Sequence, residues 1–173
     1  MTTDAKQFAT NAHHGQVRKY TGEPYIVHPE AVARLVSSVT DDPETIAAAW
    51  LHDVVEDTPV SLREIQVRFG STVATLVDWV TNKFTCGERE VRKALERIRL
   101  RNADLRAKTI KLADMLDNVP SMVEHDPDFA KVYVQEKRLL LDCLRGGNEE
   151  LWHQAQIMLY HCYHQLGLND DHA

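Results

Sequence analysis

The amino-acid sequence predicts an all-α protein, a single compact bundle of about eight to ten helices in which residues 1–173 form one domain. Apolar residues recur at helical spacing in successive segments, and only seven glycines and six prolines interrupt 173 residues. The breaks between segments coincide with residues that start or stop helices. A chain of this length can bury one sizeable core, and no repeat or linker divides it.

The first segments are short helices separated by turn signals. We expect a first helix that ends near Tyr20, before a Thr-Gly-Glu-Pro turn, and a second that has Pro29 in its first turn. Asp42 followed by Pro43 is typical of an N-cap with proline at the first helical position. The third helix, residues 45–56, is apolar nearly all round, which places it in the middle of the bundle.

Capping signals mark the next helices. Ser61 and Glu64 have the spacing of a capping box, and Gly70 ends the helix that they open. Ser71 opens another helix with apolar residues at helical spacing. Residues 85–106 are richly charged, which indicates a solvated helix face with salt-bridge pairs.

Three further helices follow in the second half. Residues 109–118 have acids among apolar residues, and we expect Pro120 to end this helix. Residues 127–144 and 149–166 form two more helices, separated by the Gly-Gly-Asn breaker 146–148.

Composition limits the class of protein and its partners. The formal net charge of −6 lacks the basic excess typical of nucleic-acid binding, so we expect no nucleic-acid partner. No apolar run approaches the roughly 18–20 residues of a membrane span, and the N-terminus lacks the apolar core of a signal peptide. Three scattered cysteines favour a reducing compartment, so we expect a cytoplasmic protein without membrane association. A homo-oligomer remains open.

The end of the third predicted helix carries an unusual group of polar residues. His52 and Glu56 are four residues apart, and so are Asp53 and Asp57. Charged groups at the end of a core helix cost several kcal/mol to desolvate unless they are paired or bind a metal. A divalent cation held by His and Asp, with the remaining acids handling a water molecule, accounts for all four.

Two further residues extend this group. His28 lies at the start of one helix and Asp114 lies on another apolar helix. Together with His52 and Asp53 they offer two imidazoles and two carboxylates from three helices. This mixed set suits Mn²⁺, Fe²⁺ or Zn²⁺ better than Ca²⁺.

The pattern His28…His52-Asp53…Asp114 resembles the HD superfamily of metal-dependent phosphohydrolases. The flanking segments YTGEPYIVHP, AAAWLHDVVEDT, RFG and KLADMLDN are similar to the hydrolase domain of RelA/SpoT-type alarmone enzymes. They resemble in particular the stand-alone small alarmone hydrolases and the metazoan SpoT homologues. The resemblance covers roughly residues 5–168 and leaves no room for a synthetase domain, so it implies hydrolytic activity only.

The resemblance implies a cofactor, a reaction and a role for each matching residue. One Mn²⁺ per chain would be held by His28, His52, Asp53 and Asp114. Glu56 and Asp57 would orient and activate the attacking water. Substrate contacts would come from Arg18, Lys19, Lys83, Lys111 and Asn118. The implied reaction releases pyrophosphate from the 3′ position of guanosine or adenosine alarmones, (p)ppGpp or (p)ppApp.

Departures from the family leave the substrate open. In the metazoan relatives a basic and then an aromatic residue lie near the nucleotide, and here Tyr133 and Lys137 are interchanged. Both bases therefore remain open, as does another nucleotide such as NADPH. A catalytically idle nucleotide-binding module is a further alternative, against which the intact Glu56 and Asp57 argue. We expect Asp117 to lie on the surface, and the sequence does not decide whether His13 and His14 lie near the pocket.

Overall fold

The structure is helical almost throughout. The computed structural model describes residues 1–168, and residues 169–173, which the single-domain prediction includes, lie outside the described part. Within residues 1–168 there are ten helices and no strand: α1 (Thr2–Ala12), α2 (Val27–Ser37), α3 (Pro43–Leu51), α4 (Val54–Asp57), α5 (Leu62–Phe69), α6 (Ser71–Val80), α7 (Arg89–Arg101), α8 (Leu105–His125), α9 (Pro127–Cys143) and α10 (Glu149–Gln165). The predicted all-α class of eight to ten helices is confirmed.

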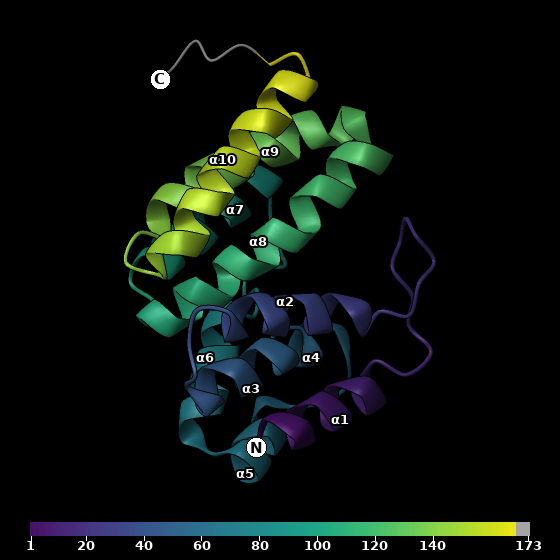
Figure 1. Cartoon of the computed structure of the whole chain (residues 1–173), viewed down its shortest axis with the longest axis vertical. Helices are drawn as coiled ribbons and strands as arrows, with labels where there is room; N and C mark the ends of the chain where they lie inside the picture. Colours follow the sequence, from purple (N-terminus) through teal and green to yellow (C-terminus); the bar gives the residue numbers. More distant parts are fainter. Residues whose placement is uncertain (169–173) are drawn as a thin grey trace.

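The helices form two groups that share α8. Figure 1 shows α1 to α6 in one half of the molecule and α8, α9 and α10 in the other, with α2 at the boundary. Helix α8 has 21 residues and contacts α2, α3 and α6 on one side and α9 and α10 on the other. The middle turns of α8 therefore face the N-terminal half of the chain.

The predicted central helix is central. Helix α3 contacts α1, α2 and α6, and four of its apolar residues, Ala47, Ala48, Ala49 and Leu51, are completely buried. Complete burial of a leucine side chain stabilises a fold by about 1.5–3 kcal/mol. Because this helix is fixed on several sides, its C-terminal end is a rigid place from which to present functional groups.

The predicted caps are present. The Asp42 side chain accepts hydrogen bonds from the backbone N–H groups of Glu44 and Thr45 at the start of α3. Ser61 and Glu64 form a reciprocal capping box at α5. Gly70 ends α5 with φ of 93°, a backbone conformation that favours glycine.

The prediction that the first helix extends to Tyr20 is wrong. Helix α1 ends at Ala12, and residues 13–26 form a loop. Gly15 has a φ of 82°, which no helix accommodates. The loop doubles back on itself, because Arg18 N–H donates to Glu23 C=O at 2.8 Å and Tyr25 N–H donates to Gln16 C=O at 2.9 Å.

The predicted single helix over residues 45–56 is two helices. Helix α3 ends at Leu51, a turn occupies His52 and Asp53, and the four-residue α4 follows. His52 and Glu56 therefore do not lie on one continuous helix, although both remain at the same end of the bundle. No glycine or proline marks the break, which explains why the sequence pattern did not reveal it.

Pro120 does not end its helix, contrary to the prediction. Helix α8 continues to His125. Proline fits helical φ but lacks an N–H group, so it cannot donate to the carbonyl of Leu116 four residues earlier. Val119 and Val123, on either side of Pro120, are almost completely buried, and this packing offsets the lost hydrogen bond.

The charged helix forms salt bridges as predicted, mainly to other elements. In α7, Arg89 pairs with Glu136 of α9 and Arg99 pairs with Asp78 of α6, while Lys93 pairs with Glu96 on α7 itself. These pairs attach α7 to both halves of the molecule.

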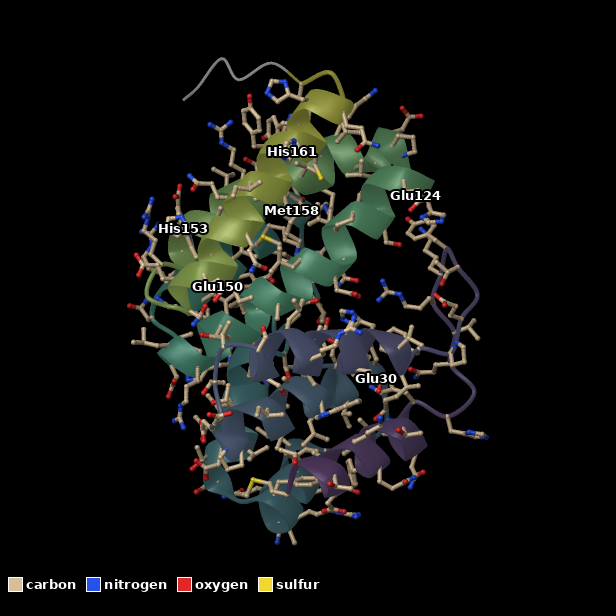
Figure 2. All side chains as sticks on the ribbon, viewed as in Figure 1. Glu30, Glu124, Glu150, His153, Met158 and His161 are labelled. Atoms are coloured by element: carbon tan, nitrogen blue, oxygen red, sulfur yellow. The ribbon has the colours of Figure 1, made fainter. Side chains whose placement is uncertain are left out.

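The outer face of α10 carries charged and polar residues as well as the exposed Ile157 and Tyr160. Figure 2 shows Glu150, His153 and His161 along the outside of this helix, where all three are exposed. Among the described residues, no helix combines the length and the apolar character that a membrane crossing requires.

Candidate active site

Two histidines and two aspartates meet where α2, the α3–α4 turn and α8 come together. His28 lies in the first turn of α2, His52 and Asp53 form the turn after α3, and Asp114 lies in the middle of α8. His28, His52 and Asp114 are buried, and one ligand atom from each lies within 4.8 Å of the other two. The structure thus brings three of the four predicted metal ligands into one candidate metal site.

Asp53 completes the group. Its Oδ2 lies 3.1 Å from Nε2 of His52 and 3.4 Å from Nε2 of His28. Oδ1 of Asp114 lies 3.4 Å from the same His28 nitrogen, and the two Nε2 atoms are 3.1 Å apart. All four predicted ligands therefore direct a donor atom toward one point.

The outer nitrogen of each imidazole has its own partner. Nδ1 of His52 lies 2.8 Å from the carbonyl oxygen of Ala49, and a carbonyl only accepts, so Nδ1 donates. Nδ1 of His28 lies 2.6 Å from Oδ2 of Asp117 and donates to that carboxylate. Such outer partners fix the tautomer of metal-binding histidines. In the neutral rings both Nε2 lone pairs consequently face inward.

This arrangement fits a bound cation. Two inward lone pairs 3.1 Å apart repel each other unless a proton or a metal ion lies between them. Two imidazole nitrogens and two carboxylate oxygens are the donor set that first-row divalent metals accept.

The charges of the ligands point the same way. Burial opposes the charged imidazolium, yet the carboxylates of Asp114, Asp117 and Asp53 raise the pKa of His28 to about 11. Burial likewise opposes ionisation of Asp53 and Asp114. The neighbouring imidazoles nevertheless hold the pKa of the Asp53 carboxyl well below its usual range. Lys111 and the same imidazoles hold the pKa of the Asp114 carboxyl well below its usual range. The site therefore attracts positive charge, whether carried by a proton or by a metal ion.

Glu56 and Asp57 lie at the open edge of this cluster. Oε2 of Glu56 accepts a hydrogen bond from Asn82 N–H at 2.8 Å. Partial burial raises the pKa of the Glu56 carboxyl, and partial burial together with the charge of Asp53 raises that of Asp57. Raised carboxyl pKa values suit groups that take up and return protons.

Tyr25 is a residue of this site that the sequence did not single out. Its hydroxyl lies 2.6 Å from Oδ2 of Asp53 and 3.0 Å from Oδ2 of Asp57. Burial and the two carboxylates raise the pKa of this phenol, so it remains protonated. Its position three residues before His28 was the one available signal.

Asp117 also belongs to the site, so the expectation that it lies on the surface is wrong. Besides contacting His28, its Oδ2 lies 3.2 Å from Nη1 of Arg18. Residues three apart share a helix face, so the face of α8 that directs Asp114 to the cluster also directs Asp117 there.

A pocket of about 200 Å³ lies beside the cluster. It is lined by Arg18, Lys19, Tyr20, Tyr25, Asn118, Ser121 and Met122. Asn118 donates from Nδ2 to Oδ1 of Asp114 at 2.6 Å, and its Oδ1 lies 3.4 Å from Nη1 of Arg18. Three of the five predicted substrate-binding residues therefore line one pocket next to the candidate metal site.

The two other predicted substrate residues have different surroundings. Lys111 is largely buried and donates from Nζ to Oδ2 of Asp114 at 2.6 Å. Burial opposes its charge, but Asp114 and Glu96 raise the pKa of Lys111. Lys83 instead pairs with Asp78 at 2.6 Å and does not contact the cluster.

Comparison with known proteins agrees with this geometry. The family model described as HD domain matches residues 5–141. A solved structure of a metazoan ortholog of SpoT, which hydrolyzes ppGpp and plays a role in starvation responses, superposes with a TM-score of 0.84. The sequence identity is 32%, and the superposed region covers 97% of this chain and 96% of the chain of that structure. A second solved structure, lmo0812 from Listeria monocytogenes EGD-e, has a TM-score of 0.71 at 28% identity and covers 84% of this chain and 99% of its own.

Longer curated proteins match as well. The guanosine-3′,5′-bis(diphosphate) 3′-pyrophosphohydrolase of Haemophilus influenzae is 41% identical over 161 residues, which are 85% of this chain and 24% of that protein. The bifunctional (p)ppGpp synthase/hydrolase SpoT of Escherichia coli K12 is 39% identical over 125 residues, which are 69% of this chain and 18% of that protein. The chain thus spans about a quarter or less of these two relatives. The extent of the match and the geometry of the cluster together show that this chain belongs to the HD-domain family and is homologous to the SpoT hydrolase domain and its metazoan ortholog.

Proposed function

We propose that this protein is a Mn²⁺-dependent 3′-pyrophosphohydrolase of alarmone nucleotides, (p)ppGpp, (p)ppApp or both. The observation that carries the proposal is the convergence of the His28 and His52 nitrogens with the Asp53 and Asp114 oxygens beside a pocket lined by Arg18 and Lys19. The metazoan SpoT ortholog that hydrolyzes ppGpp has the same fold over nearly its whole length, which supports this substrate class.

The metal would be held by His28, His52, Asp53 and Asp114. When bound there, a divalent cation supplies Lewis-acid polarisation of a phosphoryl oxygen and lowers the pKa of water. The mixed nitrogen and oxygen donors admit Mn²⁺, Fe²⁺ or Zn²⁺, and the choice of Mn²⁺ follows from the resemblance to RelA/SpoT-type hydrolases.

The pocket residues would bind the phosphates. Arg18 presents a guanidinium, which can bind a phosphate through two parallel hydrogen bonds. Lys19 is exposed at the rim, where its Nζ donates to the Tyr20 hydroxyl at 3.0 Å, and it adds a second positive charge. This local field would attract a polyanionic nucleotide although the chain as a whole is acidic.

Glu56 and Asp57 would move the protons. Because their pKa values are raised, each can accept a proton from the attacking water and return one to the 3′-oxygen that leaves. The Tyr25 hydroxyl would lie between the carboxylates of Asp53 and Asp57 and donate its single proton to one of them at a time. Asn82 would hold Glu56 through its backbone N–H.

The proposal is tested by pyrophosphate release, with and without Mn²⁺, from matched guanosine and adenosine 3′-pyrophosphates. We expect metal-dependent release that is lost in Glu56→Ala, with the ratio of the two rates giving the preferred base. Release from neither nucleotide by metal-loaded protein would refute the alarmone assignment. Turnover of NADPH, measured as release of inorganic phosphate, would then favour a different nucleotide, and no turnover on any nucleotide would favour an idle binding module.

A further inference from the structure

His13 is a buried imidazole with one nitrogen left over. Only 3% of the His13 surface is exposed to solvent, and Nδ1 of the ring lies 2.8 Å from Oε1 of Gln16. Its Nε2 is the one buried side-chain nitrogen or oxygen without a hydrogen-bond partner among the described residues. Such an unpaired buried group destabilises the folded state. A native structure that retains it calls for an explanation.

The directions of the hydrogen bonds around His13 are fixed by Asp57. The Gln16 side chain donates from Nε2 to the backbone carbonyl oxygen of Asp57 at 2.8 Å. A carbonyl only accepts, so the amide nitrogen of Gln16 must face Asp57 and its oxygen must face His13. Nδ1 of His13 is therefore the donor, and a chain of two hydrogen bonds runs from His13 through Gln16 to the backbone of Asp57.

The His13 ring also contacts Tyr25, whose hydroxyl lies beside the carboxylate of Asp57. The His13 ring lies 4.7 Å from the Tyr25 ring, centroid to centroid. The Tyr25 hydroxyl lies 3.0 Å from Oδ2 of Asp57. Asp57 is thus held at its backbone by Gln16 and at its carboxylate by Tyr25, and His13 contacts both supports.

We infer that His13 is a positioning residue for Asp57, acting through Gln16 and Tyr25. This inference rests on the proposed function, because it assumes that Asp57 handles protons in the reaction. It also accounts for the unpaired nitrogen. The position needs a donor for Gln16 and a flat ring for Tyr25 at once. An imidazole supplies both and leaves Nε2 over, whereas phenylalanine lacks the donor and asparagine lacks the ring.

The test compares His13→Asn, which keeps a donor near the place of Nδ1, with His13→Phe, which keeps the ring, and His13→Ala, which keeps neither. For His13→Ala we expect kcat to fall about 10- to 100-fold, the scale on which small misplacements of reacting groups act. KM and the bound metal should change less than threefold, about 0.7 kcal/mol. Asn and Phe should each recover part of kcat. The matched control is His14→Ala, since His14 is the exposed neighbour and should leave kcat unchanged.

A double-mutant cycle with Gln16→Ala separates a shared path from two independent effects. We expect the double variant to be about as slow as the slower single variant. Multiplicative losses, or a His13→Ala enzyme with at least half of the wild-type kcat, would overturn the inference.

A readout that needs no substrate keeps this test separate from the proposed function. In the wild-type background, hydrogen exchange of the α4 amides should be slow, and it should accelerate in both His13→Ala and Gln16→Ala but not in His14→Ala. If wild-type protein releases no pyrophosphate from alarmones, the proposed function fails while this exchange pattern still tests the positioning role. Unchanged α4 exchange in both variants would overturn that role even in an active enzyme.

Discussion

Replacing Asp117 with alanine removes the carboxylate that accepts the hydrogen bond from Nδ1 of His28 at 2.6 Å. The same change deprives Arg18 of an ion pair at 3.2 Å. His28 then loses the partner that fixes its tautomer and aims Nε2 at the candidate metal site. We expect the variant to fold normally and to bind Mn²⁺ more weakly.

The size of this loss follows from the geometry. A hydrogen bond to a charged group contributes about 1.5–3 kcal/mol, and removal of an outer partner of a metal ligand typically weakens metal binding by about 10- to 100-fold. The Asp117 side chain is 23% exposed, so water can solvate the Nδ1–H group that it leaves. This favours the lower half of the range, a fall of about 10- to 30-fold, or about 1.4–2 kcal/mol.

Calorimetric titration of metal-free protein with Mn²⁺ at fixed pH measures this affinity. The matched control is Asp128→Ala, an acid on α9 whose side chain is 98% exposed and pairs with Lys131. An Asp117→Ala protein that binds Mn²⁺ as tightly as the control would refute the reasoning that Asp117 supports the metal ligand His28.

Further predictions follow from the same geometry. Glu56→Gln should lower kcat by about 10²- to 10⁴-fold while the bound Mn²⁺ measured by elemental analysis stays at the wild-type level; a variant as active as wild type would exclude Glu56 from proton transfer. Because the pKa of the Glu56 carboxyl is raised above 4.5, its ionised form, which acts as the base, appears only at higher pH. The value of kcat should therefore increase with pH through a midpoint above 4.5, and a midpoint at or below 4.5 would contradict this assignment. Arg18→Ala should raise KM by about tenfold, because Arg18 lines the pocket. Lys83→Ala, which removes only the ion pair with Asp78, should change KM less than twofold. Equal effects of the two substitutions on KM would refute the assignment of this pocket to the substrate. Chelation of the metal should lower the melting temperature, because an ion that binds only the folded state stabilises it, and identical melting curves with and without Mn²⁺ would argue against the site.

The four candidate metal ligands could be proposed from residue type and context. Each of His28, His52, Asp53 and Asp114 interrupts an otherwise apolar helix or borders one, and burial of such groups without a partner is too costly to be incidental. His28 and Asp114 lie on predicted helices, whereas His52 and Asp53 lie in the turn after α3, which the sequence pattern did not reveal.

The supporting residues were not predictable in the same way. His13, Gln16 and Tyr25 act from the loop over residues 13–26, and a loop has no periodicity from which the direction of a side chain can be read. Asp117 was misjudged although its spacing of three residues from Asp114 places both side chains on one face of α8.

The two-residue break between α3 and α4 has a consequence for how this site tolerates change. His52 and Asp53 keep right-handed helical backbone angles at the break, with φ of −59° and −98°, so the chain continues to turn in the same sense although α3 ends at Leu51. The break separates the rotational register of the core helix from that of the short α4, which carries the acids proposed to handle protons. Repacking within α3 can therefore be absorbed at the break without turning those acids away, whereas an inserted residue at the break would move them and leave the core intact. A designer who wished to transplant this site would need to copy the interruption along with the residues.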